Sequence, residues 1–236
     1  MTKKFYCLNI GSRSSSIELP HILQDHFNII SLDVDPACEP DICCDLLSLP
    51  QREDLPLGEG GLRTHRKFDA VYCSHVLEHF SPEDSMAALR AINHVLKTDG
   101  FAIIRIPSIE ALVLHCQTYG LGFQESLHEH TGIPRGVSGQ NVIFGMPLEG
   151  PWMAHKRHYT GRELVQELNA CGFSQVSGGF FPHAIEIMVV AHGDNLNPEL
   201  DELIMKDTTS IYLARSHPTG NDGTPQEGEI LTKAGE

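Results

Sequence analysis

The sequence predicts an α/β protein built on a parallel, doubly wound sheet. Short apolar segments typical of buried strands alternate with amphipathic segments of helical periodicity along the first half of the chain. Strands that alternate with helices at this spacing form a parallel sheet with helices on both faces. A chain of 236 residues, 41% hydrophobic and 20% charged, is long enough for one substantial globular domain.

The first strand and its turn are the segment FYCLNIGSRSSS, from Phe5 to Ser16. Gly11 allows a tight turn, and the serines that follow it can cap a helix. In an open α/β sheet this turn lies at the carboxyl ends of the strands, where ligands bind. An amphipathic helix is expected over residues 17–27, with Pro20 in its first turn.

The next two strands end in carboxylates. Residues 28–32 form an apolar strand followed by Asp33 and Asp35, and residues 40–45 form a short strand closed by Asp45. An acidic side chain at the tip of the second strand can accept hydrogen bonds from ribose hydroxyls, or it can simply be a polar strand end. Residues 51–66 are rich in glycine and charge and are expected to form a loop.

The middle of the chain continues the alternation. The sequence predicts a buried strand over 67–74, a helix over 82–97 with Ser81 as N-cap, a strand over 101–107 and a helix over 108–119. The residues Thr98-Asp99-Gly100 are expected to stop the first of these helices.

Residues 120–159 break this rhythm, with many glycines and a concentration of histidines. So long an irregular stretch inside a compact domain is usually functional. A helix over 160–171, with Thr160 and Glu163 as a capping box, and two antiparallel strands over 173–181 and 184–192 then follow. The predicted organisation is one domain over 1–195, with 120–159 as an insertion that covers the acceptor, an extension over 196–214, and a disordered tail over 215–236.

Five ordered blocks resemble class I S-adenosylmethionine-dependent methyltransferases, in particular the broad group with a VLEH segment after the fourth strand. The blocks are LNIGS, SLDVDP, PDICCDLLSLP, FDAVYCSHVLEHF and LKTDGFAIIRIPS, within residues 4–110. The later stretch MAHKRHYTGRELVQELNACGF is similar to the late helix of such proteins. The resemblance implies a Rossmann-like, mostly parallel seven-stranded sheet with an antiparallel last strand, S-adenosyl-L-methionine as cofactor, and methyltransferase activity.

The resemblance also assigns the cofactor site. Asp33, with Asp35 as its competitor, would hold the ribose, and Asp45 with the Leu46 backbone would hold the adenine. The residues expected to bind the cofactor are Asn9, Gly11, Ser12, Arg13, Asp33, Val34, Asp45, Leu46, Ser74 and His75.

The first loop departs from the family pattern of acid-x-Gly-x-Gly-x-Gly. Asn9 replaces the acid, Arg13 the second glycine and Ser15 the third. Asn9 can still accept a hydrogen bond but has no charge to balance the cofactor ammonium. Arg13 would pair with the methionine carboxylate or point to solvent.

Histidines supply the catalytic candidates. If the VLEH segment is helical, His75 and His79 share a face with Glu78 close by. We expect His75 to be a site residue and Glu78 and His79 to shape the pocket wall. The other candidate bases or hydrogen-bond donors for the acceptor are the loop histidines His128, His130, His155 and His158.

The loop histidines have two alternative roles. They are either acceptor groups or solvated loop residues. Two closely spaced histidine pairs can also ligate a transition metal, but their spacing matches no standard metal motif, so no metal is predicted.

Composition narrows the partners and the compartment. Acidic residues outnumber basic ones 31 to 17, which argues against a nucleic-acid partner, and no apolar run is long enough to cross a membrane. No signal peptide is expected from the first residues, and the seven cysteines include no C-x-x-C pair. Cys7, Cys43, Cys44 and Cys73 lie in apolar runs, as buried free thiols do. A cytoplasmic location is expected, and a homodimer is compatible with the sequence.

The predicted function is transfer of a methyl group to the O, N or S atom of a small molecule. One alternative is methylation of a peptide or protein side chain, with residues 120–159 as the docking surface. The other is a non-catalytic relative that binds the cofactor or a partner, a reading suggested by the altered first loop.

Overall fold

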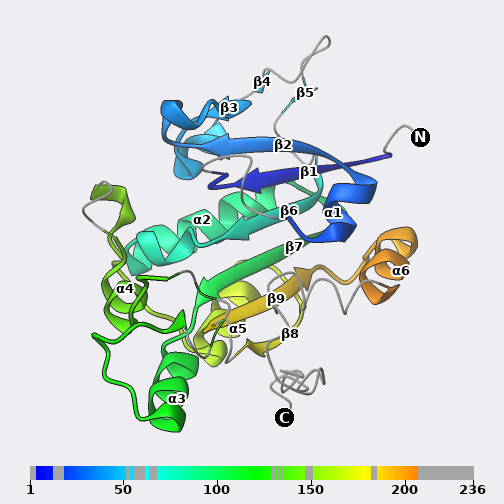
Figure 1. Ribbon diagram of the computed structural model, residues 1–236. Coiled ribbons are helices and arrows are strands. Elements are labelled where there is room, and N and C mark those ends of the chain that lie inside the picture. Colours follow the sequence, from blue (N-terminus) through cyan, green and yellow to red (C-terminus); the bar gives the residue numbers. More distant parts are fainter. Residues whose placement is uncertain are drawn as a thin grey trace.

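A computed structural model describes residues 4–12, 19–51, 54–55, 62–63, 68–128, 131, 133, 135–146, 151–181 and 185–206 (Figure 1). Its main sheet has seven strands in the order β3-β2-β1-β6-β7-β9-β8. They are β1 (Phe5–Ile10), β2 (Phe27–Asp33), β3 (Ile42–Cys43), β6 (Phe68–Ser74), β7 (Leu96–Pro107), β8 (Gln175–Phe181) and β9 (Glu186–His192).

The strand directions confirm the predicted fold class. The pairs β1–β2, β2–β3, β1–β6 and β6–β7 are parallel, whereas β9 runs antiparallel to both β7 and β8. The protein therefore has the mostly parallel seven-stranded sheet with an antiparallel last strand that the family resemblance implies. The carboxyl ends of the parallel strands meet at one edge of the sheet, the edge at which such folds bind ligands.

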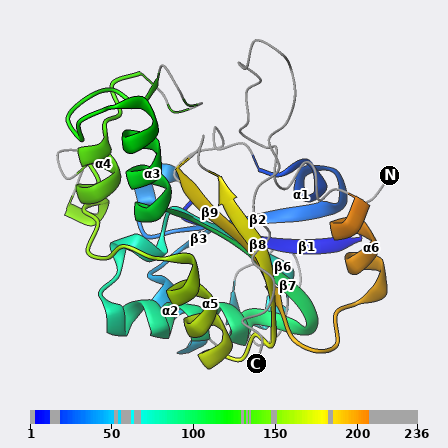
Figure 2. The same cartoon turned by 90° about the horizontal axis from the view of Figure 1, so that it is seen from below.

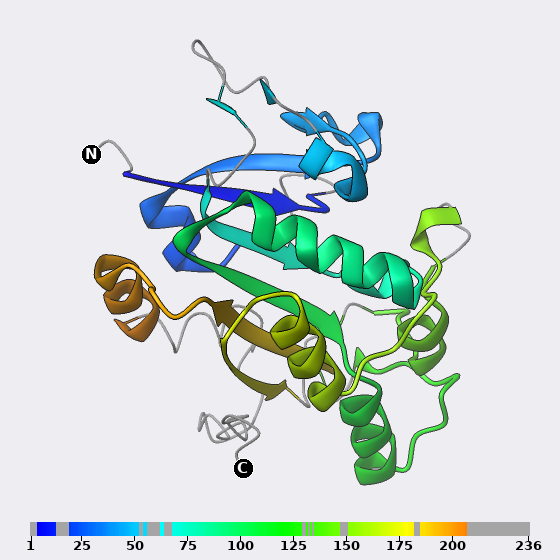
Figure 3. The same ribbon diagram turned by 180° about the vertical axis from the view of Figure 1, so that it is seen from behind.

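Helices cover both faces of the sheet. The helices are α1 (His21–His26), α2 (Pro82–Val95), α3 (Ile109–Tyr119), α4 (Gly139–Phe144), α5 (Gly161–Ala170) and α6 (Pro198–Lys206). Apolar side chains of α2 and α5 pack with one face, and those of α1 and α6 with the other (Figure 3). Helices α3 and α4 lie together beyond the end of the sheet and share a smaller apolar cluster (Figure 2).

Local capping explains where several helices begin. The side-chain oxygens of Ser81, Ser108 and Thr160 accept hydrogen bonds from backbone amides in the first turns of α2, α3 and α5. At α5 the side chain of Glu163 also accepts from the Thr160 amide, which completes the predicted capping box. These signals are local in the sequence and were therefore predictable.

The first helix is shorter than expected. Residues 17 and 18 lie outside the described part, and α1 begins only at His21 because Pro20 has an extended backbone with φ −50° and ψ 140°. The residue before a proline also avoids the helical region, so the helix does not start earlier. Phe27, expected to end this helix, is the first residue of β2.

The predicted stop at residues 98–100 was wrong, because these residues lie within β7. Leu96 already pairs with Phe68, and the register shifts before Phe101 pairs with Ala70. A Cβ added to Gly100 would lie 2.7 Å from the Asp69 carbonyl oxygen. The glycine therefore lets β7 lie against β6 rather than ending a helix.

Three further expectations need correction or lie outside the described part. Residues 51–66 contain a small antiparallel pair, β4 (Asp54–Leu55) with β5 (Leu62–Arg63). Cys43 is exposed because it faces outward from the two-residue edge strand β3, while Cys7, Cys44 and Cys73 are buried. The predicted disordered tail lies outside the described residues, as does all the chain beyond residue 206.

The insertion carries some regular structure, namely α4 and a 3₁₀ turn, η6 (Pro151–Met153). Helix α6 lies in the expected C-terminal extension and buries Leu200 against the sheet. Among the helices of the described residues, none combines the length and apolar character needed to cross a bilayer.

Candidate active site

The turn after β1 is built around Gly11. This residue has φ +70°, and a Cβ placed on it would lie 2.4 Å from Cγ2 of Val76. Its amide donates to the carbonyl oxygen of Leu32 at 2.8 Å, which ties the turn to β2. Asn9 and Ser12 are buried on either side of it. Glycine is thus the residue that this turn accepts, while Arg13 lies outside the described residues.

The end of β2 distinguishes the two competing aspartates. Asp33 is buried as the last residue of the strand, and its Oδ1 accepts from the Asp35 amide at 3.0 Å. Asp35 instead caps the short turn η1 (Pro36–Cys38), because its Oδ1 accepts from the Ala37 amide at 2.9 Å. Asp33 therefore occupies the strand tip, whereas Asp35 lies beyond the strand and caps η1.

The end of β3 brings Asp45 to the same edge. Asp33 pairs with Cys43 in the sheet, so Asp45 follows two positions beyond that pair. Asp45 is exposed, and its Oδ1 accepts from the Leu47 amide at 2.9 Å. Leu46 is buried at the start of the 3₁₀ helix η2 (Leu46–Gln51). Val34, which follows Asp33, is 55% exposed.

The segment after β6 does not form the helix that would place His75 and His79 on one face. Ser74 is buried at the strand end, and His75 has φ +56°, the left-handed region. Only η3 (Leu77–His79) is helical, as a single 3₁₀ turn. His75 and His79 therefore do not share a helical face, although His75 still contacts Glu78.

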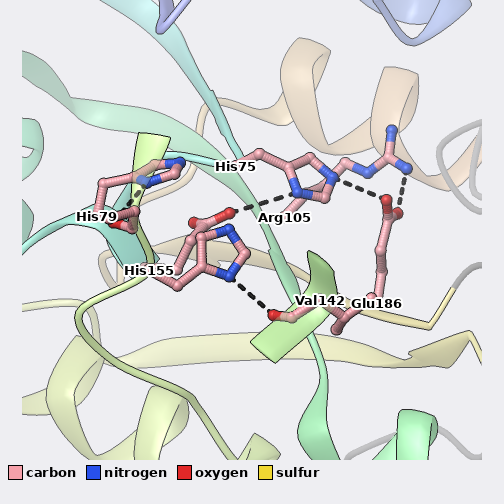
Figure 4. A network of polar contacts seen from close by, with 8 residues as sticks. His75, His79, Arg105, Val142, His155 and Glu186 are labelled. Atoms are coloured by element: carbon pink, nitrogen blue, oxygen red, sulfur yellow. Dashed lines mark hydrogen bonds and ion pairs between the residues drawn. The ribbon is translucent and has the colours of Figure 1, made fainter. Parts of the chain in front are cut away.

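The ring of His75 lies between two carboxylates. Its Nε2 is 2.8 Å from Oε1 of Glu186, and its Nδ1 is 3.4 Å from Oε1 of Glu78 (Figure 4). The other oxygen of Glu186 accepts from the guanidinium of Arg105, which in turn donates to the Tyr72 hydroxyl at 3.2 Å. This network joins β6, β7 and β9; Arg105 and Glu186 are buried in it, whereas the His75 side chain is 36% exposed.

The network shifts the pKa values of its members. Burial alone would lower the pKa of His75, but the carboxylates of Glu186 and Glu78 raise it to about 9. Burial alone would raise the pKa of Glu186, but His75 and Arg105 lower it to about 2. The two carboxylates therefore favour the protonated ring of His75, which makes it a weaker candidate for a general base.

The structure divides the loop histidines. The rings of His155 and His79 have centroids 5.0 Å apart (Figure 4). The ring centroids of His155 and His158 are 6.5 Å apart. His128 instead bonds through Nδ1 to the Ile133 carbonyl at 2.8 Å, and His130 lies outside the described residues. We call His75 and His79, from the turn after β6, together with His155 and His158, from the end of the insertion, the histidine site.

Backbone contacts attach that end of the insertion to the VLEH segment. The amides of Lys156 and Arg157 both donate to the Glu78 carbonyl, at 2.8 and 3.2 Å. The Arg157 guanidinium donates to the Ser85 hydroxyl at 2.8 Å and pairs with Glu167 on α5. These contacts fix the position of the insertion's end relative to the sheet edge.

Sequence reasoning missed Arg105, Glu186 and Tyr72. A signal for two of them exists, since Arg105 is the only charge in the apolar segment FAIIRIP and Glu186 lies in the apolar segment AIEIMVV. A charge inside a buried strand needs a partner. The pairing itself depends on β7 and β9 being neighbours, which no local pattern predicts.

Similar solved structures share the fold. No curated protein sequence matches the chain. The PH0226 protein from Pyrococcus horikoshii OT3 is 12% identical, with a TM-score of 0.51 over 81% of this chain and 83% of that protein. An O-methyltransferase family protein from Burkholderia thailandensis is also 12% identical, with a TM-score of 0.51 over 80% of this chain. The citrinin polyketide synthase CMeT domain is 10% identical, with a TM-score of 0.51 over 82% of this chain.

At such low identities these similarities show the fold alone. The chain spans 51% of the Burkholderia protein and 47% of the polyketide synthase structure, about half of each. The family comparison goes further, because the family model for a methyltransferase domain matches residues 6–177, from β1 into β8. The chain therefore belongs to the methyltransferase domain family, the class I S-adenosylmethionine-dependent methyltransferases.

Proposed function

We propose that this methyltransferase acts on a small molecule and methylates an O, N or S atom. The observation that carries the proposal is the arrangement of one sheet edge. The carboxyl ends of β1, β2 and β3 present a glycine turn and two carboxylates, and the ends of β6, β7 and β9 present a histidine site beside them. A donor site and an acceptor site are what a direct methyl transfer requires.

The residues on the first side fit an adenosine-bearing cofactor. The buried Asp33 at the strand tip can accept hydrogen bonds from ribose hydroxyls. The exposed Val34 offers an apolar surface for the adenine ring, and Asp45 with the Leu46 amide can bond the ring's polar edge. Gly11, whose missing side chain keeps the turn tight, together with Asn9, Ser12 and Ser74, would bind the methionine end. S-adenosylmethionine supplies an electrophilic methyl group on a sulfonium whose leaving thioether needs no proton.

The histidine site would hold the acceptor. His75 is fixed by Glu186 and Glu78 and bounds the site on the side of β9. His155 and the exposed His158 come from the insertion, and a hydroxyl or ammonium acceptor needs such a hydrogen-bond partner or base. Within the described residues, these two histidines remain candidates for a direct contact with the acceptor.

The insertion would also cover the acceptor. Phe144 and Trp152 are 61% and 51% exposed, so the insertion presents apolar side chains to solvent. Single exposed apolar residues are common, but here they lie on the segment fastened to the histidine site. This supports a role for residues 120–159 as a cover that excludes water from the acceptor.

Ligand analysis and turnover test the proposal together. Mass spectrometry of ligand released from the purified chain should detect S-adenosylmethionine or S-adenosylhomocysteine, and calorimetry should detect binding of both. A panel of hydroxyl, amine and thiol compounds should then yield a methylated product. Absence of heat for either ligand would defeat the proposal. Binding without turnover would favour a non-catalytic protein, and turnover only with peptides would favour a side-chain methyltransferase.

We also propose a cytoplasmic location and a small-molecule partner, with a homodimer as a possible assembly. All seven cysteines are free thiols, which supports a reducing compartment such as the cytoplasm. The net charge of −14 supports a partner that is neither nucleic acid nor an anionic membrane surface. A homodimer would be recognised by its mass in solution.

A further inference from the structure

Glu78, His79 and His155 bring one potential metal-ligand atom each to within 4.8 Å of the others. We propose that these three side chains bind a divalent transition-metal ion, beside the site assigned to the acceptor. In the sequence, His155 was grouped with His128 and His130 because all three lie in residues 120–159. In the structure its neighbours Glu78 and His79 lie on the turn after β6.

The histidine tautomers favour metal binding. Nδ1 of His79 is 3.1 Å from the Ala154 carbonyl oxygen, and Nδ1 of His155 is 2.8 Å from the Val142 carbonyl oxygen (Figure 4). A carbonyl oxygen only accepts, so Nδ1 carries the proton in both rings. In the neutral ring Nε2 then presents its lone pair. Metal-bound histidines are typically oriented by such a hydrogen bond from the other ring nitrogen to a backbone carbonyl or carboxylate.

The carboxylate of Glu78 supplies the independent sign of a ligand. The residue is 2% exposed, and neither carboxylate oxygen has a hydrogen-bond partner among the described residues. Its ion-pair contact with Nδ1 of His75, at 3.4 Å from Oε1, lacks hydrogen-bond geometry. His75 balances part of the charge of this carboxylate, but the buried oxygens have no hydrogen-bond partner among the described residues. A metal ion bound between Glu78 and the two imidazoles would use these lone pairs and offset the cost of burying them.

The donor set selects the class of metal. Magnesium and calcium prefer sites made of oxygen ligands, whereas two imidazoles with one carboxylate suit zinc and its first-row neighbours. Three protein ligands leave at least one coordination position open, as in catalytic zinc sites. His158 is the nearest further histidine on the same segment, with its ring 6.5 Å from that of His155.

A free coordination position on this metal would add a way of binding the acceptor, and this step rests on the proposed function. A metal held by these three residues would have a free coordination position, which could take an oxygen or sulfur atom of the acceptor. A metal at that place would favour acceptors that present a hydroxyl or thiol over amines that are protonated at neutral pH. The metal site itself does not depend on that role, because its binding can be measured alone.

The site is held in place before a metal binds. The Glu78 carbonyl accepts from the amides of Lys156 and Arg157, and the Arg157 side chain is itself fixed by Ser85 and Glu167. The turn that carries Glu78 and His79 is thereby fastened to the segment that carries His155. A site with ligands already in position loses little conformational entropy on binding.

Direct metal titration tests the proposal. The full chain without a histidine tag, treated with chelator and dialysed, is titrated with Zn²⁺ by calorimetry and with Co²⁺ by visible absorption. We expect one equivalent of Zn²⁺ and a Co²⁺ spectrum typical of nitrogen and oxygen ligands. Glu78→Gln and His155→Asn should each weaken binding about 100-fold or more.

His192 provides the matched control. Its Nδ1 also contacts a backbone carbonyl, that of Gly193 at 2.7 Å, but it lies outside the three-residue group. His192→Asn should leave Zn²⁺ affinity unchanged. If the parent binds no metal, or if both variants bind as tightly as the parent, the proposal is overturned. An equal loss in His192→Asn would likewise overturn it.

Folding and cofactor binding are measured in parallel. Circular dichroism reports whether Glu78→Gln folds, and if it does not, His155→Asn on the half-buried end of the insertion decides the outcome. S-adenosylhomocysteine is titrated into the chelated parent and both variants. Failure of S-adenosylhomocysteine to bind would defeat the proposed function, whereas the Zn²⁺ titration decides the metal site by itself.

Discussion

Arg105 and Glu186 form a buried ion pair between neighbouring antiparallel strands. Arg105 lies on β7 and Glu186 begins β9, and their side chains are 5% and 7% exposed. Glu186 also bonds His75, so the pair connects the sheet core with the histidine site. A buried pair of this kind is costly to break, because the remaining charge has no water to replace its partner.

Glu186→Gln should lower the free energy of unfolding by about 3 kcal/mol at pH 7, because Arg105 would remain charged and buried without a carboxylate. The pKa of Glu186 is lowered from 4.5 to about 2, so its ionised form stabilises the parent above pH 4.5. That stabilisation is lost as the pH falls from 4.5 towards 2, and the gap between variant and parent should narrow. Urea unfolding at pH 7 and pH 3 measures both quantities.

Glu199→Gln is the control for this effect. Glu199 pairs with Lys4 at 2.7 Å, but both side chains are more than half exposed. Loss of such a surface pair should cost less than about 1 kcal/mol at either pH. A similar cost for the two variants would show that burial of the Arg105 pair is not the cause.

Gly11→Ala should destabilise the protein more than Gly120→Ala. Both glycines have positive φ, +70° and +66°, but only the Cβ at residue 11 meets a neighbour, Val76. We expect about 1 kcal/mol for the backbone strain at residue 120 and about 2–3 kcal/mol at residue 11. Thermal unfolding of both variants measures the difference, and equal costs would mean that Val76 moves aside freely.

Asp33→Ala should weaken binding of S-adenosylhomocysteine by about 1–3 kcal/mol, because ribose donors would lose a charged acceptor. Asp35→Ala should have a smaller effect, since Asp35 caps the turn η1. Calorimetry of the two variants compares them directly. If only Asp35→Ala loses affinity, the ribose role belongs to Asp35.

Double replacement of His155 and His158 by asparagine should lower turnover by about 10²-fold or more while cofactor binding survives, because these residues would contact the acceptor and not the cofactor. His192→Asn serves as the control histidine. Steady-state kinetics and S-adenosylhomocysteine calorimetry separate the two effects. Unchanged turnover in the double variant would show that these histidines have no catalytic role.

Arg13→Ala tests the altered first loop, although Arg13 lies outside the described residues. A guanidinium beside the cofactor loop can bind a carboxylate in bidentate fashion. The variant should therefore lose affinity for the complete cofactor and none for adenosine. Equal losses for both ligands would argue against contact with the methionine carboxylate.

The sequence predicts what depends on neighbouring residues along the chain. The glycine turn, the helix caps at Ser81 and Thr160, and the alternation of strands and helices are local patterns, and the structure has all of them. The sequence left open whether the VLEH segment is helical, and in the structure only Leu77–His79 form a 3₁₀ turn, after a left-handed backbone at His75.

The histidine site depends on tertiary contacts. Arg105 meets Glu186 because β7 and β9 are neighbours, and His155 meets His79 because the insertion folds back onto the turn after β6. His155 was grouped with His128 because both lie in residues 120–159, and a shared segment is a poor guide to such contacts. The apolar sequence around Arg105 and around Glu186 did indicate that each charge needs a buried partner.

The contact between Gly11 and Val76 has a consequence for protein engineering. The space that a side chain at residue 11 would need is filled by Cγ2 of Val76, which follows the histidine at the end of β6. The turn after β1 and the turn after β6 are therefore not independent modules. A chimera that imports the first turn from a relative must import residue 76 with it, and a donor with a larger residue at position 11 must bring a smaller one at position 76.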